Sequence, residues 1–227
     1  MKIYNLKDAA TESDAAESKR LVVSDLRQGL KNPDRVNVFV DGKFLFSLDI
    51  SQVVDYKLKV GKQISEEELD ELKRASEFGK LYQRALEWVL VRPRSEKETR
   101  DYLYKKIFEK KLDKKYIDEI IGKLKDKKYL DDQKFAEWWV ENRFVNKGVS
   151  SKRLRMELLK KGISNSVIDE VLDARDDDEE IMKIIAKKRA RYADDEKLMA
   201  YLIRQGFPFE LVKEKIRLYE TDSQNLE

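Results

Sequence analysis

The sequence predicts a mainly α-helical protein, in which three tandem three-helix repeats follow a small antiparallel β-sheet. The first observation is that a helix–glycine–helix pattern in residues 154–172 recurs in residues 198–216. The second is that β-prone residues gather in residues 21–49, where two short runs are divided by Asp41-Gly42. The third is composition, since 41% of the residues are charged and the chain has only 3 Pro and 8 Gly. This balance favours amphipathic helices with charged outer faces over a β-sandwich.

The head of the chain is expected to comprise residues 21–80. Residues 1–20, which precede it, are polar and lack a sustained apolar period, so we expect them to be disordered. Two β-prone runs separated by Asp41-Gly42 are a strong hairpin signal. We therefore predict a three-stranded antiparallel sheet over residues 21–49. Because so small a sheet is not stable alone, it is expected to pack against the helix that follows.

Two helices are predicted within the head. Residues 50–56 are typical of a short helix. A longer helix is expected to begin after Ser65, because Ser65 and Glu68 have the spacing of a capping box. We expect this longer helix to bend or break near Gly79.

From Leu81 onward the apolar residues follow a 3.6-residue period, and the pattern repeats. At an offset of 44 residues, Leu154 aligns with Leu198, and Gly162-Ile163 aligns with Gly206-Phe207. The expected units are residues 81–130, 131–175 and 176–218, followed by a polar C-terminal tail at residues 219–227. Each unit would contain three short helices that bury an apolar stripe partly inside the unit and partly against its neighbours.

Composition argues against catalysis. The chain has no Cys and no His, and His is both the commonest metal ligand and the commonest general base. The paired carboxylates Asp131-Asp132 stand just before a predicted helix, where a capping role explains both residues. We therefore predict a protein that binds rather than catalyses, without a cofactor or a bound metal. The absence of a long apolar run and of a secretory signal predicts a cytoplasmic protein that does not cross a membrane.

Basic residues supply the candidate binding surface. Net charge is only +3, but residues 147–161 carry six Lys or Arg against one acid, and residues 183–191 carry five against none. The candidate partner- or DNA-binding residues are Lys147, Lys152, Arg153, Lys160, Lys161, Lys183, Lys187, Arg191 and Trp138. Outward Lys and Arg side chains suit phosphate groups or an acidic protein groove. Ordinary solvated helix faces are the competing interpretation.

Three positions, one of which is the candidate Trp138, have a structural interpretation that we favour over binding. Trp138 points about 100° away from its neighbour Trp139, so we expect it to pack on an adjacent repeat. Its alternative role is that of an exposed anchor for a partner. Arg100 and Arg155 align with each other beside the apolar stripe. We expect each to pack its aliphatic stem and to pair its head with a carboxylate.

Four stretches of the sequence together resemble the RecX family of bacterial regulatory proteins. They are Arg94-Ser95-Glu96-Lys97-Glu98, Tyr129-Leu130-Asp131-Asp132-x-x-Phe135-Ala136, Arg143-x-x-x-Lys147-Gly148 and Arg153-Leu154-x-x-Glu157-Leu158-x-x-Lys161-Gly162-Ile163. They run through two repeats in the right order, and the resemblance covers residues 80–218. Family members often have Gly where this chain has Lys128, which leaves the turn geometry at that position open.

The resemblance implies a function. RecX-like proteins bind the RecA recombinase and its filament on single-stranded DNA, inhibit its recombinase and ATPase activities, and also bind DNA, without a cofactor. We therefore expect a cytoplasmic, monomeric RecA regulator that acts in homologous recombination, DNA repair and the SOS response. The alternative is a helical-repeat protein that binds single- or double-stranded DNA independently of a recombinase. Reversing Arg153 and Lys160 to Glu is expected to weaken binding and to leave helicity unchanged.

Overall fold

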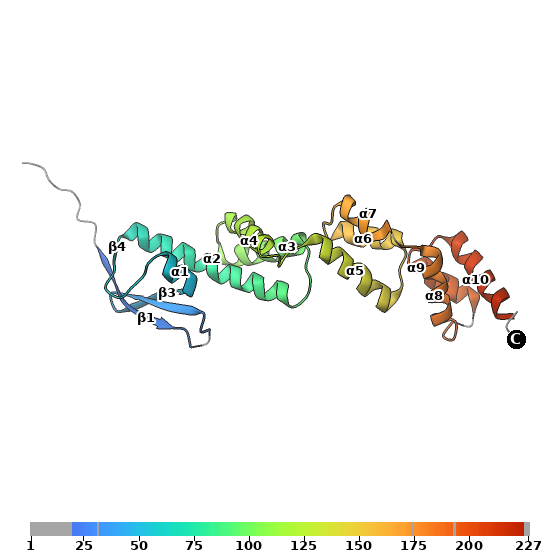
Figure 1. Ribbon diagram of the computed structural model, residues 1–227, viewed down its shortest axis with the longest axis horizontal. Coiled ribbons are helices and arrows are strands. Elements are labelled where there is room, and N and C mark those ends of the chain that lie inside the picture. Colours follow the sequence, from blue (N-terminus) through green and yellow to red (C-terminus); the bar gives the residue numbers. More distant parts are fainter. Residues whose placement is uncertain (1–19, 31, 174, 193, 225–227) are drawn as a thin grey trace, which may run out of the picture. The chain divides into compact units, whose positions relative to one another are not determined.

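The computed structural model describes residues 20–30, 32–173, 175–192 and 194–224 (Figure 1). The chain forms two compact units that divide between Leu81 and Tyr82. The first unit holds the β-sheet and the second holds the helical repeats. The disorder expected for residues 1–20 falls, except for Arg20, outside the described residues.

The sheet of the first unit has four strands rather than the three that were predicted. In chain order they are β1 (Leu21–Gln28), β2 (Arg35–Val40), β3 (Lys43–Asp49) and β4 (Gln63–Ile64). Their order in the sheet is β3-β2-β1-β4, and every neighbouring pair is antiparallel. The prediction of three antiparallel strands over residues 21–49 is confirmed. The short strand β4, which pairs with the start of β1, was not predicted because two residues carry no readable alternation.

The hairpin between β2 and β3 forms at the predicted position. Asp41 and Gly42 both have positive φ angles, 47° and 77°, as a tight hairpin turn requires. The inner face of the sheet buries Val23, Val38 and Leu48 completely, and these residues share a core with Leu72 of the following helix. Burial of this apolar face against the helix gives the small sheet its stability.

Two helices complete this part of the chain, α1 (Ile50–Asp55) and α2 (Glu66–Leu90). The predicted capping box is present, because Ser65 N donates to Glu68 Oε2 at 2.9 Å while Glu68 N donates to Ser65 Oγ at 3.2 Å. The predicted break near Gly79 was wrong, since α2 is continuous through it. A Cβ at Gly79 would lie 3.0 Å from Oε1 of Gln52. The glycine therefore permits a close approach to α1 rather than ending the helix.

The second unit contains the three predicted repeats. The first consists of the C-terminal part of α2 with α3 (Glu96–Lys110) and α4 (Lys115–Asp126). The second consists of α5 (Asp132–Lys147), α6 (Ser151–Lys160) and α7 (Asn165–Asp173). The third consists of α8 (Asp177–Lys188), α9 (Asp195–Arg204) and α10 (Phe209–Gln224). Helix α10 continues beyond residue 218, where the repeat was expected to end, so most of the expected tail is helical.

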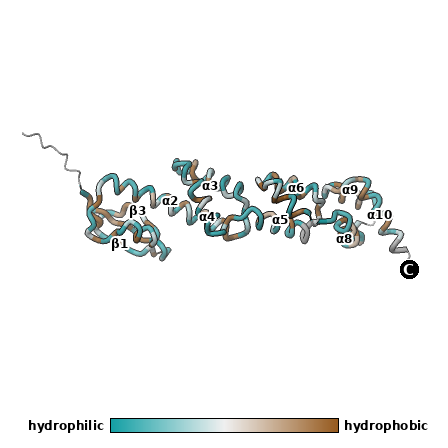
Figure 2. Tube along the Cα trace, turned by 45° about the horizontal axis from the view of Figure 1, so that its top comes forward, coloured by the Kyte–Doolittle hydropathy of each residue, from teal (hydrophilic) through white to brown (hydrophobic). Residues whose placement is uncertain are grey.

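Each repeat buries the apolar stripe that the sequence pattern indicates. In the second repeat Leu154, Leu158 and Ile168 are completely buried in one core. In the third repeat Leu198 and Leu202, which align with Leu154 and Leu158, occupy the corresponding places. Figure 2 shows hydrophobic and hydrophilic residues alternating along these helices, as expected for amphipathic elements.

Polar contacts join the first repeat to the second. Ser95, the N-cap of α3, donates its hydroxyl to the carbonyl oxygen of Lys161 at 2.7 Å. One residue later, Glu96 N donates to Oδ1 of Asp132 at 2.8 Å. Asp132 therefore joins the repeats, whereas its neighbour Asp131 is the N-cap of α5 and accepts from Lys134 N. The capping interpretation is therefore confirmed for Asp131, whereas Asp132 has a structural partner in the preceding repeat instead.

The same kind of contact joins the second repeat to the third. Ser150, the N-cap of α6, donates its backbone N–H to the carbonyl oxygen of Gln205 at 3.1 Å. Ser151 N donates to Oδ1 of Asp177 at 2.9 Å. A serine cap and a carboxylate of the next repeat thus recur at both junctions, so the repeats share their mode of packing as well as their sequence.

Candidate functional site

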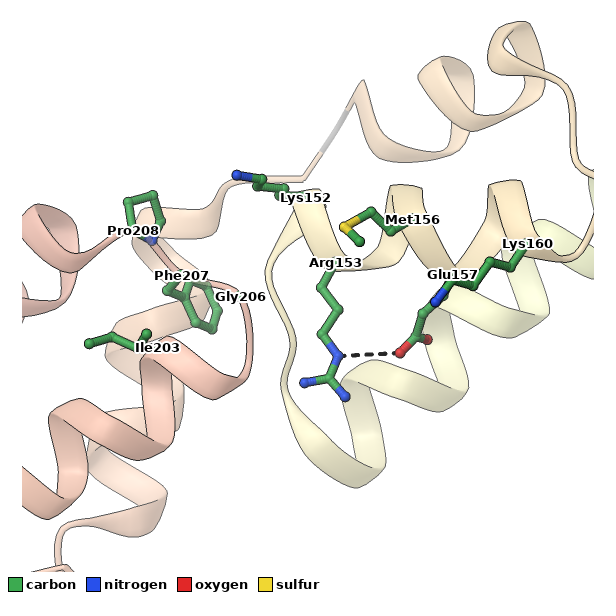
Figure 3. Close-up of a pocket in the computed structure, with 9 residues that line it drawn as sticks. All are labelled: Lys152, Arg153, Met156, Glu157, Lys160, Ile203, Gly206, Phe207 and Pro208. Carbon is green, nitrogen blue, oxygen red and sulfur yellow. Dashed lines mark hydrogen bonds and ion pairs between the residues drawn. The ribbon is translucent and has the colours of Figure 1, made fainter.

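Helix α6 presents a basic face opposite its buried one. Ser150 caps the helix by accepting from Arg153 N at 3.2 Å, and Leu154 and Leu158 point into the core. On the outer side Lys152, Met156 and Lys160 follow one another at four-residue spacing, which places them along one stripe of an α-helix. Figure 3 shows these side chains along the groove that α6 forms with the turn after α9.

This groove has a volume of about 530 Å³ and lies at the junction of the second and third repeats. Its apolar lining comes from Met156 on one side and from Ile203, Phe207 and Pro208 on the other. Met156 is 53% exposed and Ile203 is 42% exposed, so apolar surface is open to a partner. Exposed Met is common in surfaces that adapt to protein partners, because its side chain is flexible and polarizable.

A glycine sets the width of the groove. Gly206 has a φ of 96°, a conformation that L side chains rarely adopt. A Cβ at this position would lie 2.5 Å from Oγ of Ser150 and 2.9 Å from Cβ of Arg153. The turn after α9 therefore approaches the start of α6 only because residue 206 has no side chain.

The charge along the groove is positive. Lys152 and Lys160 are exposed and form no ion pair within the described residues. The acidic residue in the lining is Glu157, and its carboxylate already accepts from three donors. These donors are Trp139 Nε1 at 3.0 Å, Arg143 Nε at 2.8 Å and Arg153 Nε at 3.3 Å. With Glu157 neutralised by its own repeat, the two lysines are available to an acidic partner.

Arg153 has a structural task in addition to lining the groove. Its guanidinium pairs with Glu157 and donates to the carbonyl oxygen of Arg204 and to Oε1 of Gln205 in the third repeat. The sequence indicated an outward cation, and the structure shows a half-buried bridge between two repeats. Reversal of this charge would therefore disturb the junction itself.

Lys161 also lies at a junction. Its ammonium pairs with the carboxylate of Glu98 at 2.6 Å and lies 5.0 Å from the ring centroid of Trp139. Burial acts to raise the pKa of Glu98, but hydrogen bonds from Arg92 and Lys161 outweigh it and hold that pKa below its usual value. Lys161, which was expected to be free for a partner, is thus part of an ion pair between the first and second repeats.

Trp138 packs against a neighbouring repeat, which is the role that the sequence analysis favoured. It is half-buried, with its ring centroid 6.0 Å from that of Phe135, and the guanidinium of Arg92 in the preceding repeat lies 5.6 Å from its ring. Arg100 and Arg155 also match their structural interpretation. Arg100 pairs with Glu96 and Asp118, and Arg155 pairs with Asp169.

The remaining candidate cations do not line the groove. On α8, Lys183 pairs with Glu179 at 3.3 Å, whereas Lys187 is exposed. Helix α8 ends at Lys188, so Arg191 lies in the turn after it, 5.8 Å from the ring of Tyr192. The side chain of Lys147, the last residue of α5, is outside the described part of the chain. The groove thus brings together Lys152, Arg153 and Lys160 out of nine predicted residues.

Sequence reasoning missed the far wall of the groove. The alignment of Gly206-Phe207 with Gly162-Ile163 identified a turn, but it gave no sign that this turn faces α6.

Among the described residues, no group of three or more Asp or Glu side chains is arranged to hold a metal ion. None of the described helices combines the length and apolar character needed to cross a membrane.

Comparison with known proteins places this chain in a family. The RecX second three-helix domain matches residues 131–172, and the regulatory protein RecX N-terminal domain matches residues 22–65. Regulatory protein RecX of Bacillus velezensis is 35% identical over 205 residues, which cover 86% of this chain and 76% of that protein. Regulatory protein RecX of Listeria monocytogenes is 32% identical over 192 residues, or 81% of this chain and 70% of that protein.

Solved structures agree with the sequence comparison. A crystal structure of regulatory protein RecX shares the fold with a TM-score of 0.67 and 23% identity, covering 85% of this chain and 97% of that one. The crystal structure of RecX from Lactobacillus salivarius has a TM-score of 0.52 and 25% identity, covering 63% of this chain and 97% of that one. The chain belongs to the RecX family of regulatory proteins.

Proposed function

We propose that this protein binds the RecA recombinase, including its filament on single-stranded DNA, and inhibits its recombinase and ATPase activities in the cytoplasm. Family membership over most of the chain carries this proposal. The groove beside α6 supplies a surface on which an acidic segment of the recombinase could dock. No step of this function requires catalysis by the protein itself.

The chemistry of the groove supports a protein partner. Ile203 gives the lining an aliphatic side chain and Met156 gives it a thioether, while Lys152 and Lys160 lie at the rim. Protein interfaces commonly combine an apolar centre with a polar rim. Nucleic-acid bases, in contrast, are usually held on exposed aromatic rings, and Phe207, the aromatic residue of the lining, is only 2% exposed. An acidic segment with apolar anchors therefore suits this groove better than a nucleic-acid strand does.

The decisive measurement is the ATPase and strand-exchange activity of the cognate recombinase with increasing amounts of this protein. We expect both activities to fall as the protein is added. Unchanged activity at saturating protein would reject the proposal.

A matched pair of variants tests the groove. Lys152→Glu with Lys160→Glu should raise the concentration needed for inhibition by at least about tenfold, because it replaces two attractive charges by two repulsive ones. Lys43→Glu with Lys59→Glu makes the same change of net charge at exposed lysines of the first unit and should inhibit normally. Equal loss in both variants would mean that general charge, and not the groove, governs inhibition.

The alternative is DNA binding without a recombinase. It predicts steep salt dependence on bare single strands, because binding releases counterions from the phosphates. Negligible binding to bare DNA, with tight binding to the filament, would exclude it. The feature that favours a DNA contact is the pair of exposed aromatic residues Tyr104 and Phe108 on helix α3, which does not line the groove.

A further inference from the structure

Helix α3 exposes two aromatic rings on one face. Tyr104 and Phe108 are four residues apart, so they lie side by side along the helix. Tyr104 is 50% exposed and Phe108 is 87% exposed, the highest value among the exposed large hydrophobic residues described in the second unit. The neighbouring face of the helix, about 100° away, buries Leu103 and Ile107. The core therefore does not account for either ring.

The surroundings of these rings are strongly basic. Residues 104–116 contain six Lys against two acids, and both acids are already paired. Glu109 pairs with Lys106 at 3.0 Å, and Asp113 pairs with Lys115 at 3.4 Å. Lys105 and Lys111 are exposed and form no ion pair within the described residues. Free positive charge thus lies on both sides of Phe108 in the sequence.

Lys111 is in a backbone conformation that glycine usually supplies. It ends α3 with a φ of 54°, and the helix closes with a hydrogen bond from Leu112 N to the carbonyl oxygen of Ile107 at 3.1 Å. At such helix ends glycine is the usual residue, because a Cβ is disfavoured in the left-handed region. The chain keeps an exposed cation three residues from Phe108 at some cost in backbone energy.

We propose that Tyr104, Lys105, Phe108 and Lys111, here called the aromatic–lysine face, bind single-stranded nucleic acid. Bases stack on the two rings, and the two ammonium groups contact phosphates on the strand. Every base has a flat π surface, so such binding tolerates different sequences. A duplex hides those surfaces inside its own stack, and it can use only the lysines. The face therefore prefers single strands, and it needs no recombinase to bind them.

The test is the fluorescence anisotropy of a labelled oligo(dT), and of a duplex of equal length, titrated with the full chain in the absence of recombinase. Phe108→Leu keeps apolar bulk but removes the ring. It should lower the affinity for oligo(dT) about tenfold, as expected for the loss of one stacked base, and leave duplex binding unchanged. Phe108→Tyr keeps the ring and should bind as the wild type does. Phe209→Leu, at a 49% exposed Phe of α10, is the matched control and should also bind normally.

Lys111→Gly separates binding from folding. It relieves the left-handed strain, so the melting temperature should rise by about 2–4 °C. It also removes a phosphate contact, so the affinity for oligo(dT) and its dependence on salt should both decrease. A variant that is more stable but binds less cannot be explained by misfolding.

Wild-type affinity for oligo(dT) in Phe108→Leu would overturn the proposal, as would an equal loss in Phe209→Leu. An equal loss for oligo(dT) and duplex would also overturn it, because it would exclude stacking. Since no recombinase is present, these outcomes are independent of the inhibition assay on the groove. Either proposal can therefore fail without the other.

Discussion

At the scale of single residues, Lys128 shows how one side chain can occupy a turn that its family often gives to glycine. It has a φ of 60°, and the turn closes with a hydrogen bond from Tyr129 N to the carbonyl oxygen of Leu124 at 2.8 Å. The turn that the sequence left open is therefore the usual left-handed helix end, with a lysine in the place of glycine.

This geometry makes a prediction about stability. Lys128→Gly should raise the free energy of unfolding by about 1 kcal/mol, because glycine enters the left-handed region without a steric penalty. Lys127→Gly removes the same charge one residue earlier, where φ is −85°, and should give no gain. Urea denaturation of both variants measures the difference. An equal change in the two would show that charge, not backbone conformation, controls stability here.

Side-chain direction was predictable for residues that face their own core and less so for those at the junctions. The helical periodicity correctly predicted that Leu154 and Leu158 point into the core. It also indicated that Arg153 points outward, and local charge made Lys161 a candidate binding residue, yet each of them contacts a neighbouring repeat. Helical spacing gives a direction relative to one helix, and it does not say which other helix covers that direction. Lys152 and Lys160 are for this reason a cleaner test of the groove than the expected reversal of Arg153 with Lys160.

At the scale of helices and turns, the glycines at the junctions control how closely repeats approach. Gly206→Ala would place a Cβ 2.5 Å from Oγ of Ser150 at a φ of 96°. We expect it to lower the free energy of unfolding by about 1–3 kcal/mol, since strain and overlap act together. Gly122→Ala, inside α4 and with no atom within 4 Å of its Cβ, should instead raise it by about 0.5–1 kcal/mol.

Thermal or urea unfolding of these two alanine variants provides the measurement. Because the substitution is chemically the same, only its position can give opposite signs. Two stabilising results would mean that the turn after α9 is free to move away from α6. The groove would then be wider than the structure shows.

Elements encoded locally were the easiest to predict. The Asp41-Gly42 hairpin depends on two adjacent residues that accept positive φ, so its signal is complete within the sequence. The continuity of α2 through Gly79 depends instead on packing, because the glycine lies against Gln52 of α1. A glycine inside a helix costs about 1 kcal/mol, an amount that tertiary contacts readily offset. That contact joins residues far apart in the chain, and helical periodicity does not report it.

At the scale of the whole molecule, the two proposed surfaces lie on consecutive repeats of one unit. The aromatic–lysine face belongs to α3 in the first repeat, and the groove belongs to α6 in the second. Neither surface has the fully enclosed pocket that gives high affinity alone. Contacts on one scaffold reinforce each other, because engagement of the first raises the effective concentration of the second.

A single strand partly coated with recombinase presents both partners together. We expect the wild type to bind it about 100-fold more tightly than it binds either the bare strand or free recombinase. Lys152→Glu with Lys160→Glu should reduce this affinity to the level of the bare strand, because only the aromatic–lysine face remains engaged. The control with Lys43→Glu and Lys59→Glu should keep the full affinity. If the groove variant still bound the coated strand 100-fold more tightly than the bare one, the two surfaces would not act as a pair, and the repeats would have to present the recombinase with a different face.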